Sequence, residues 1–295
     1  MIEWKKIDIE EELIFDHYYR QLETRSCEYT FANNVLWSPY YDITYGIVED
    51  MLVFLLCQEN DSVSFPIGAD NLKRAIEVLM QYFAEQNKEF RMHLVTSEQF
   101  EKLEAVFPDM FEIEYDRDVA DYIYESEKLI TLSGKKLHSK RNHINKFKQE
   151  NPNWSYEEIT TENLDDCKEM AKIWMEQQEE VSENRQIEFQ VTLAALDHMK
   201  RLKLEGGLIR VDGKVIAFSL GEPVCEKVYM IHIEKAFPQI QGAYPMINQQ
   251  FAEHAASKYV YINREEDMGE EGLRKAKLSY YPAFLKEKGI VTLKK

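Results

Sequence analysis

Charged and hydrogen-bonding side chains are concentrated in one stretch near the end of the chain, directly after a short apolar segment. Residues 259–262 alternate aromatic and β-branched types, which predicts a strand. The residues that follow pair carboxylates with cations and include an amide and a tyrosine: Asn263, Arg264, Glu266, Asp267, Arg274, Lys277 and Tyr280. Because α/β proteins hold their sites at the ends of strands, this stretch predicts a functional site.

Two adjacent carboxylates in this stretch are candidates for general-base chemistry. Glu266 or Asp267 could take a proton from an attacking amine, and the neighbouring Arg264 could keep one of them ionised. Alternatively, Asp267 or Glu270 could cap the helix that follows. The sequence leaves both interpretations open.

Two cations lie on the helix predicted at 271–278. Arg274 and Lys277 are three residues apart, which puts them on one helical face, where they could bind a phosphate or a carboxylate. The alternative is a pair of solvent-facing charges that contributes little.

A second candidate region, residues 134–148, carries six cations, two histidines and no acid. Leu137, Arg141, Ile144 and Lys148 recur at helical spacing, so the segment predicts a basic helix. It could simply be a solvated face on a linker helix. The histidine and asparagine side chains add directional hydrogen bonds, which favours an anion such as phosphate or a tRNA acceptor end. The anion-binding candidates are Lys136, His138, Lys140, Arg141, Asn142 and His143.

Composition limits the class of protein. The 295 residues predict two domains, and 44% hydrophobic residues are ample for packed cores. A net charge of −17 argues against a general nucleic-acid coat while leaving room for a local basic groove. The four cysteines are far apart without a CxxC motif, so we expect reduced thiols in a cytoplasmic protein and no metal site. The longest apolar run, 51–57, is too short to cross a membrane.

The same order of elements is predicted twice. The first half has a helix from 11, a hairpin of 43–48 and 51–57, a strand at 62–67, a helix at 71–85, a strand at 90–95, a helix at 97–106 capped by Ser97, and a strand at 111–115. The second half has helices at 165–179 and 189–204, a hairpin of 207–211 and 214–220 around Asp212-Gly213, a strand at 227–233, a helix at 244–257, a strand at 259–262, a helix at 271–278 and a strand at 289–293. We therefore expect an α/β protein of two joined domains, 1–133 and 151–295, with the basic helix 134–150 between them.

This order resembles the GNAT acyltransferase fold, and its duplication resembles the tandem form of Fem-type aminoacyltransferases. Four segments are similar to the phosphatidylglycerol lysyltransferase C-terminal domain family: residues 137–147, 213–221, 242–251 and 263–281. The resemblance covers essentially the whole chain. It implies two GNAT-like domains, each a mostly antiparallel mixed sheet flanked by helices.

The resemblance also implies transfer of an acyl or aminoacyl group from a carrier to an amine or hydroxyl. The acceptor would be a small molecule, a lipid or a peptide, and the carrier would be acyl-CoA or aminoacyl-tRNA, with no covalently bound cofactor. GNAT relatives bind a pyrophosphate with a glycine-rich loop at a helix N-terminus. The stretch 239–244 matches it through Gln239 and Gly242, with Tyr244 where the pattern has a small residue, and Gln241 belongs to the same candidate loop. Asn248, on the helix that follows, could contact the donor phosphate or face solvent. In GNAT relatives one helix ends in a tyrosine that acts as general acid, and the resemblance makes Tyr280 the candidate. The alternative is a tyrosine packed in the core with its hydroxyl hydrogen-bonded.

A different class of function stays open. A chain that keeps this fold without catalysis would be a binding module for an aminoacylated or phosphorylated ligand. His232, which lies among apolar strand residues, is more typical of a hydrogen-bonded, half-buried side chain than of a base.

Overall fold

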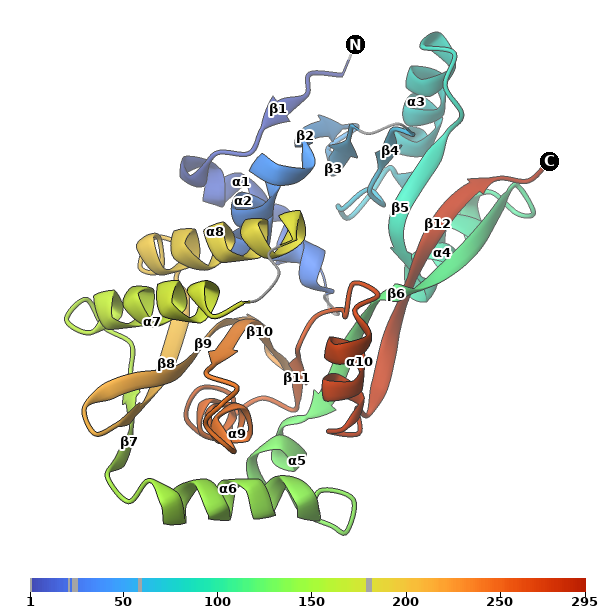
Figure 1. Ribbon diagram of the computed structural model, residues 1–295. Helices are drawn as coiled ribbons and strands as arrows, with labels where there is room; N and C mark the ends of the chain where they lie inside the picture. The colour runs from blue at the N-terminus through green and yellow to red at the C-terminus, as the bar shows by residue number, and fades with distance from the viewer. Residues whose placement is uncertain (1, 21, 23–25, 58–59, 179–181) are drawn as a thin grey trace. The chain divides into compact units, whose positions relative to one another are not determined.

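The computed structural model describes residues 2–20, 22, 26–57, 60–178 and 182–295, which form two compact units. Unit 1 contains Met1–Asp121, Glu266–Arg274 and Leu285–Lys295, and unit 2 contains Tyr122–Glu265 and Lys275–Phe284. Each unit combines segments that are far apart in the sequence, whereas the domains predicted from the sequence are contiguous. The division into 1–133, 134–150 and 151–295 stays a prediction. The boundary between residues 121 and 122 falls within the strand β6 (Phe111–Glu125), which Figure 1 labels.

Unit 1 is built on a mostly antiparallel sheet whose strands follow the order β1, β2, β3, β4, β5, β12, β6. Its elements are β1 (Lys5–Lys6), η1 (Ile9–Glu11), α1 (Glu12–Tyr19), η2 (Cys27–Tyr29), α2 (Phe31–Tyr41), β2 (Ile43–Val48), β3 (Met51–Leu56), β4 (Ser62–Val63), α3 (Leu72–Glu85), β5 (Arg91–Thr96), α4 (Ser97–Val106), the first part of β6 (Phe111–Glu125), and most of β12 (Phe284–Leu293). The hairpin of β2 and β3 turns at Glu49 and Asp50, which both have positive φ angles, as a two-residue type I′ turn requires.

The core of unit 1 lies between this sheet and α3. Ala75, Ile76, Leu79 and Phe83 recur at helical spacing along α3 and are buried against strand residues such as Val53. This apolar stripe fixes the orientation of the helix, because turning the helix would expose it to water.

Unit 2 contains the sheet order β6, β11, β10, β9, β8, β7. Its elements are α5 (Ser126–Thr131), α6 (His138–Glu150), β7 (Trp154–Glu158), α7 (Leu164–Glu176), α8 (Glu183–Asp197), β8 (Glu205–Val211), β9 (Lys214–Cys225), β10 (Val228–Ala236), α9 (Ala243–Ala255) and β11 (Tyr261–Asn263). The pairs are antiparallel except for β10 with β11, which is parallel. The helix α10 (Glu271–Leu278) contributes residues to both units.

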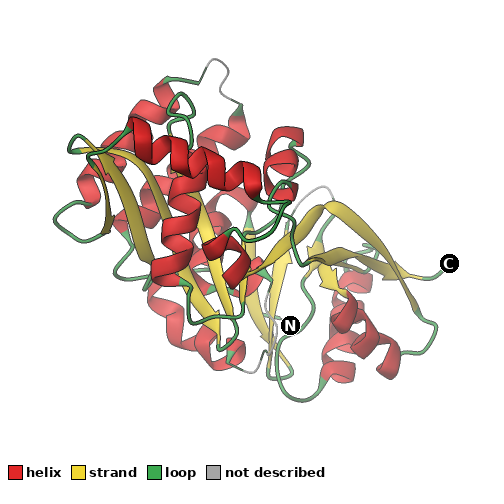
Figure 2. Ribbon diagram, turned by 90° about the horizontal axis from the view of Figure 1, so that it is seen from below, coloured by secondary structure: helices red, strands yellow, loops and turns green. Residues whose placement is uncertain are grey.

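Helices cover both faces of the central strands of unit 2. Residues Val215–Gly221 of β9 are buried without alternation, which indicates a strand covered on both faces. Figures 1 and 2 show α7 and α8 on one side of these strands and α9 on the other, and α7 and α9 both contact β9. Their packing leaves the loops at the strand ends to carry polar side chains.

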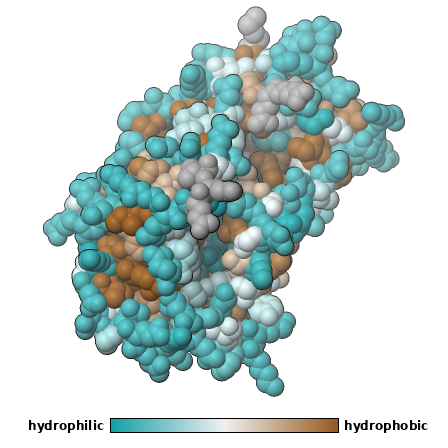
Figure 3. Space-filling view, viewed as in Figure 1, coloured by the Kyte–Doolittle hydropathy of each residue, from teal (hydrophilic) through white to brown (hydrophobic). Residues whose placement is uncertain are grey.

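The surface has the character expected from the charge of the chain. The face seen in Figure 3 is mostly hydrophilic, with apolar side chains in smaller groups. Among the described residues, no helix combines the length and the apolar character that a bilayer crossing needs.

Most predicted elements are confirmed, but several bounds differ. The predicted strand 62–67 is limited to β4 (Ser62–Val63), α8 ends at Asp197 rather than at 204, and β12 begins at Phe284 rather than at 289. The helix α4 is capped by Thr96, whose hydroxyl accepts from the backbone N–H of Gln99, so the prediction of a Ser97 cap was wrong. The helix α8 begins at Glu183 rather than at 189. Its N-cap is Ser182, whose hydroxyl oxygen accepts from the backbone N–H of Arg185. β6 extends to residue 125 rather than 115. Residue 179, the predicted end of α7, lies outside the described residues.

Candidate functional site

The chain leaves β11 through a loop that buried polar groups hold in place. Asn263 is fully buried, and its Oδ1 accepts from the backbone N–H of Glu265 at 2.7 Å. The ammonium of Lys277 donates to the carbonyl oxygens of Arg264 at 2.6 Å and Glu265 at 3.3 Å. Glu265 has a left-handed backbone (φ 57°), so these bonds stabilise a conformation that costs free energy. Asn263 and Lys277 were both predicted to bind the acyl donor or an anion. In the structure they contact the protein backbone of unit 2.

Asp267, the second candidate base, is fully buried among cations of unit 1. Its Oδ2 accepts from Nε of Arg274 at 2.9 Å and Nη1 of Arg117 at 3.2 Å, and its Oδ1 accepts from Nη2 of Arg274 at 2.7 Å. Arg274 also donates to Oδ1 of Asp118 at 2.6 Å. Asp267 Oδ1 accepts from the N–H of Gly269 at 3.0 Å, just before α10. These contacts occupy both of its oxygens. Gly269 lies before α10, so its bond fixes the preceding loop, and a cap by Asp267 or Glu270 stays a prediction.

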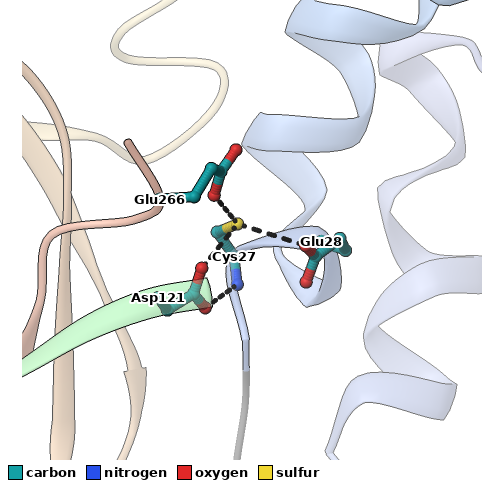
Figure 4. Close-up of side chains that lie close together, drawn as sticks. All are labelled: Cys27, Glu28, Asp121 and Glu266. Carbon is teal, nitrogen blue, oxygen red and sulfur yellow. Dashed lines mark hydrogen bonds between the residues drawn. The ribbon is translucent and has the colours of Figure 1, made fainter. Parts of the chain in front are cut away.

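Glu266, the first candidate base, belongs to a buried ionic cluster in unit 1 that Figure 4 shows in part. Its Oε2 accepts from the thiol of Cys27 at 2.9 Å and lies 3.8 Å from Nζ of Lys288. Lys288 and Asp121 are both fully buried, with Nζ 2.8 Å from Oδ1 of Asp121, and Lys288 also pairs with Glu28. Burial, together with the surrounding carboxylates, raises the pKa of the Cys27 thiol well above its usual value, so Cys27 is a thiol donor here rather than a thiolate.

The donor atoms of Cys27, Glu28, Asp121 and Glu266 all lie within 4.8 Å of one another, close enough to surround a metal ion. Lys288 already supplies a cation to this cluster. Sequence reasoning missed Cys27, Asp121 and Lys288 as companions of Glu266, because they are separated by 94 to 261 positions and form no local motif.

Tyr280, the candidate acid, lies in unit 2 beneath two cations. Its side chain is buried, Nζ of Lys140 lies 4.0 Å from its ring centroid, and the guanidinium carbon of Arg264 lies 5.2 Å away. Burial raises the pKa of Tyr280 above its usual value despite the opposing effect of Arg264, so its hydroxyl keeps its proton. Burial and the nearby Arg264 lower the pKa of Lys140. The tyrosine, the basic helix and Arg264 thus come together within one unit.

Arg264 and Asn248 share a carboxylate of β10. Arg264 Nη2 lies 2.9 Å from Oε1 of Glu234, and Asn248 Nδ2 lies 3.0 Å from Oε2 of the same residue. Among the described residues, Arg264 Nη1 and Asn248 Oδ1 are buried without a hydrogen-bond partner. One buried donor, Nη1 of Arg264, and one buried acceptor, Oδ1 of Asn248, therefore lack a partner within the described part of the chain, beside the partly buried carboxylate of Glu234.

The predicted basic helix is α6, and its cations have different environments. Arg141 donates to the carbonyl oxygens of Leu132 and Gly134, which fixes the turn before the helix. His138 and Asn142 are exposed and hydrogen-bonded to each other at 3.2 Å. Nζ of Lys136 lies 5.1 Å from the ring centroid of Tyr281. Two surface pockets of about 380 and 270 Å³ flank this turn, and the second is lined by Lys136, Tyr280 and Tyr281.

The start of α9, the predicted pyrophosphate loop, is in contact with α6. A Cβ added to Gly242 would lie 2.5 Å from the carbonyl oxygen of His143, and Gly242 has a φ of 84°. The N–H of Ala243 donates to the carbonyl of Ile240, and Pro245 has no N–H. Close packing at Gly242 and the bonded N–H of Ala243 therefore restrict the approach of an anion to this helix start. Gln241 is exposed, while Tyr244 is half-buried and bonded to the side chain of Trp174.

We expect Gly242→Ala to lower the free energy of unfolding by about 1–3 kcal/mol, because the new methyl would clash with His143 and require an unfavourable backbone conformation. The matched control is Gly272→Ala, which meets no atom within 4 Å inside α10 and should stabilise by up to about 1 kcal/mol. Urea denaturation measures both. Equal stabilities for the two variants would contradict the packing role of Gly242.

His232 is held between two carboxylates in unit 2. Its Nδ1 lies 2.7 Å from Oε1 of Glu265 and its Nε2 lies 3.0 Å from Oε1 of Glu222. Burial opposes the charged form, but the two carboxylates outweigh it and raise the pKa of His232 from 6.5 to about 10. With both nitrogens occupied, His232 matches the hydrogen-bonded side chain that its strand context predicts.

This chain is similar to one described protein family and to several solved structures. Residues 19–288 match the family described as phosphatidylglycerol lysyltransferase, C-terminal. A conserved protein of unknown function from Bacteroides thetaiotaomicron is 37% identical, with all of both chains covered and a TM-score of 0.91. L-PGS from Bacillus licheniformis is 15% identical over 98% of this chain and 92% of its own, with a TM-score of 0.66. FemX is 10% identical over 98% and 96%, with a TM-score of 0.62.

The last two similarities are too distant in sequence to show more than the fold, and they confirm the α/β fold expected of GNAT and Fem-type proteins. The family match extends over most of the chain and agrees with the resemblance carried by residues 137–147, 213–221, 242–251 and 263–281. It supports a transferase-like role without specifying donor or acceptor. The chain belongs to the phosphatidylglycerol lysyltransferase C-terminal family.

Proposed function

We propose that this protein transfers an aminoacyl group from aminoacyl-tRNA to an amine or hydroxyl acceptor. The observation that carries the proposal is the position of α6 and the turn before it in unit 2. Lys140 of α6 lies over the ring of Tyr280, and Lys136 of the turn lies over the ring of Tyr281. A cationic helix beside a protonated tyrosine suits a polyanionic carrier whose leaving group needs a proton. The family name, which denotes a lysyltransferase, supports the same reaction class.

Contacts at the start of α9 favour tRNA over acyl-CoA as the carrier. A pyrophosphate needs free backbone N–H groups and close approach at a helix N-terminus. Here Gly242 packs against the His143 carbonyl, and the Ala243 N–H is already bonded. The other donor-binding candidates named from the sequence stay proposals, with Lys136 and Lys140 the best supported.

In the proposed reaction, the acceptor nitrogen or oxygen attacks the ester carbonyl and loses its proton to a base. The bond between the carbonyl carbon and the ribose oxygen then breaks, and an acid protonates that oxygen. Tyr280, in unit 2, is the candidate acid. The assignment of Glu266, in unit 1, as the base stays a prediction from the sequence. Asp267, with both oxygens bonded, acts in this proposal as a positioning residue for the loop before α10.

We expect Tyr280→Phe to lower kcat for aminoacyl transfer at least about a hundredfold, since positioned acids contribute about 10²–10⁴. The assay would supply tRNA charged with labelled amino acids and offer phosphatidylglycerol vesicles or small amines as acceptors. The control is Tyr259→Phe, which removes the hydroxyl of a half-buried tyrosine elsewhere in unit 2.

Three outcomes would contradict parts of this proposal. Transfer from acetyl-CoA but not from charged tRNA would overturn the choice of carrier. Tight binding of charged tRNA without any transfer would favour a non-catalytic binding module. Equal activity of Tyr280→Phe and the wild type would remove Tyr280 as the acid.

A further inference from the structure

The smaller of the two pockets beside α6 combines aromatic and cationic walls. It has a volume of about 270 Å³, lies wholly within unit 2, and is lined by Glu125, Lys128, Ser133, Gly134, Lys135, Lys136, Leu137, Tyr280, Tyr281 and Ala283. Three lysines face one glutamate there, so the pocket has a local excess of positive charge in a chain whose net charge is −17. Its volume is at the lower end for small-molecule sites, which suits one small group rather than a long cofactor.

Tyr281 has an unusual backbone at the wall of this pocket. It follows α10 with a φ of 55°, and its N–H donates to the Leu278 carbonyl at 2.9 Å, which places it at the position where helices usually end in glycine. A bulky aromatic residue in the left-handed region is strained, and glycine would avoid that strain. The ring is nevertheless kept and is 50% exposed, so neither backbone geometry nor core packing accounts for it.

The ring of Tyr281 is also placed beside a cation. Lys136 Nζ lies 5.1 Å from its centroid, on the turn that joins α5 to α6. An exposed aromatic face next to lysine is the combination that single-stranded nucleic-acid sites use, with bases stacking on the ring and phosphates pairing with the cation.

We propose that this pocket binds the terminal nucleotide of a single-stranded RNA 3′ end, with the base stacked on Tyr281 and the adjacent phosphate beside Lys136 and Lys135. The inference rests on the proposed function, since it assigns the carrier end of that reaction to a place on the molecule. Tyr281 is then a recognition residue for the carrier, distinct from Tyr280, the candidate acid.

The test measures RNA binding by fluorescence anisotropy at low salt. The probes are a labelled RNA hairpin that ends in single-stranded CCA and the same hairpin without its last nucleotide. The variant is Tyr281→Gly, which removes the ring and relieves the left-handed backbone, so the protein should stay folded. Asn87→Gly, at an exposed position with φ 56° in unit 1, is the matched control for a glycine at positive φ.

Because stacking on an aromatic ring contributes about 1–3 kcal/mol per base, Tyr281→Gly should bind the complete hairpin roughly tenfold or more weakly than the wild type. Removing the last nucleotide should weaken wild-type binding by a similar factor and leave binding by Tyr281→Gly unchanged. Tyr281→Phe, which keeps the ring, should restore most of the affinity. Lys136→Ala should reduce the slope of log affinity against log salt by about 0.7.

Equal loss of affinity on nucleotide removal in the wild type and in Tyr281→Gly would overturn the inference. A lysine and tyrosine pocket could also accept a lipid phosphate, so a loss of binding to phosphatidylglycerol vesicles with unchanged RNA binding would overturn it as well. The outcome is separable from the proposed function. If the wild type transfers aminoacyl groups but its RNA affinity does not depend on the last nucleotide, only this inference is wrong. If the affinity depends on that nucleotide but no transfer occurs, only the proposed function is wrong.

Discussion

Lys288→Met should lower the free energy of unfolding by about 3–5 kcal/mol, the usual cost of removing one partner of a buried ion pair. Nζ of Lys288 lies 2.8 Å from Oδ1 of Asp121, and both side chains are fully buried in unit 1. Without the ammonium, Asp121 would keep an uncompensated charge beside Glu266 and the Cys27 thiol. Urea denaturation followed by fluorescence measures the effect, because Trp4 and Trp37 both lie in unit 1.

Lys294→Met is the matched control for this prediction. Lys294 is partly exposed, and its partner Asp109 is exposed, so the loss should stay within about 0.5 kcal/mol. The double variant Lys288→Met with Asp121→Asn should recover part of the lost stability, because it removes the stranded charge as well. A Lys288→Met protein within about 1 kcal/mol of the wild type would show that the cluster tolerates its negative charge, for instance by binding a proton.

His232 should make the wild type lose stability in alkaline solution. Its pKa is raised from 6.5 to about 10 in the folded state by Glu222 and Glu265, against the effect of burial. A raised pKa means that the folded state holds the proton more tightly than the unfolded state. The stabilisation is therefore complete below pH 6.5, declines as the pH rises from 6.5 to 10, and is absent above that, with a full size of up to about 5 kcal/mol.

His232→Gln should flatten this dependence of unfolding free energy on pH between 6.5 and 10, measured by urea denaturation at several pH values. His198→Gln serves as the control, because His198 is exposed at the end of α8 and should leave the slope intact. An identical slope in His232→Gln and the wild type would mean that the two carboxylates do not hold a charged imidazole.

Local signals were the part of the fold that the sequence could predict. The helix 271–278 has the predicted bounds, and the Asp212-Gly213 turn joins β8 and β9 with both residues at positive φ. Such features depend on residues close together in the chain, where turn preference and helical periodicity act directly. The length of β6 depends on distant partners instead. Residues 111–115 were predicted as a strand, whereas the missed continuation to residue 125 pairs at its end with β11, far along the chain.

The candidate site follows the same rule. The stretch 263–281 and the basic segment were identified because their residue types are concentrated locally. The contacts of each residue could not be predicted from the sequence, because the partners are far apart in the chain. Asp267 pairs with Arg117, 150 positions away, and Glu266 accepts from Cys27, 239 positions away. The contact of Lys140 with Tyr280 likewise joins two segments that no local pattern connects.

The split composition of unit 1 has a consequence for how the protein is made. Residues 285–295 complete the unit that contains residues up to 121, and β12 lies between β5 and β6 in its sheet. At roughly 5–20 residues per second, a ribosome needs on the order of ten to thirty seconds to synthesise the intervening segment. Throughout that time β5 and β6 lack the strand that covers their edges. The nascent N-terminal segment must therefore wait, as a partly folded species open to chaperones, until the last strand leaves the exit tunnel.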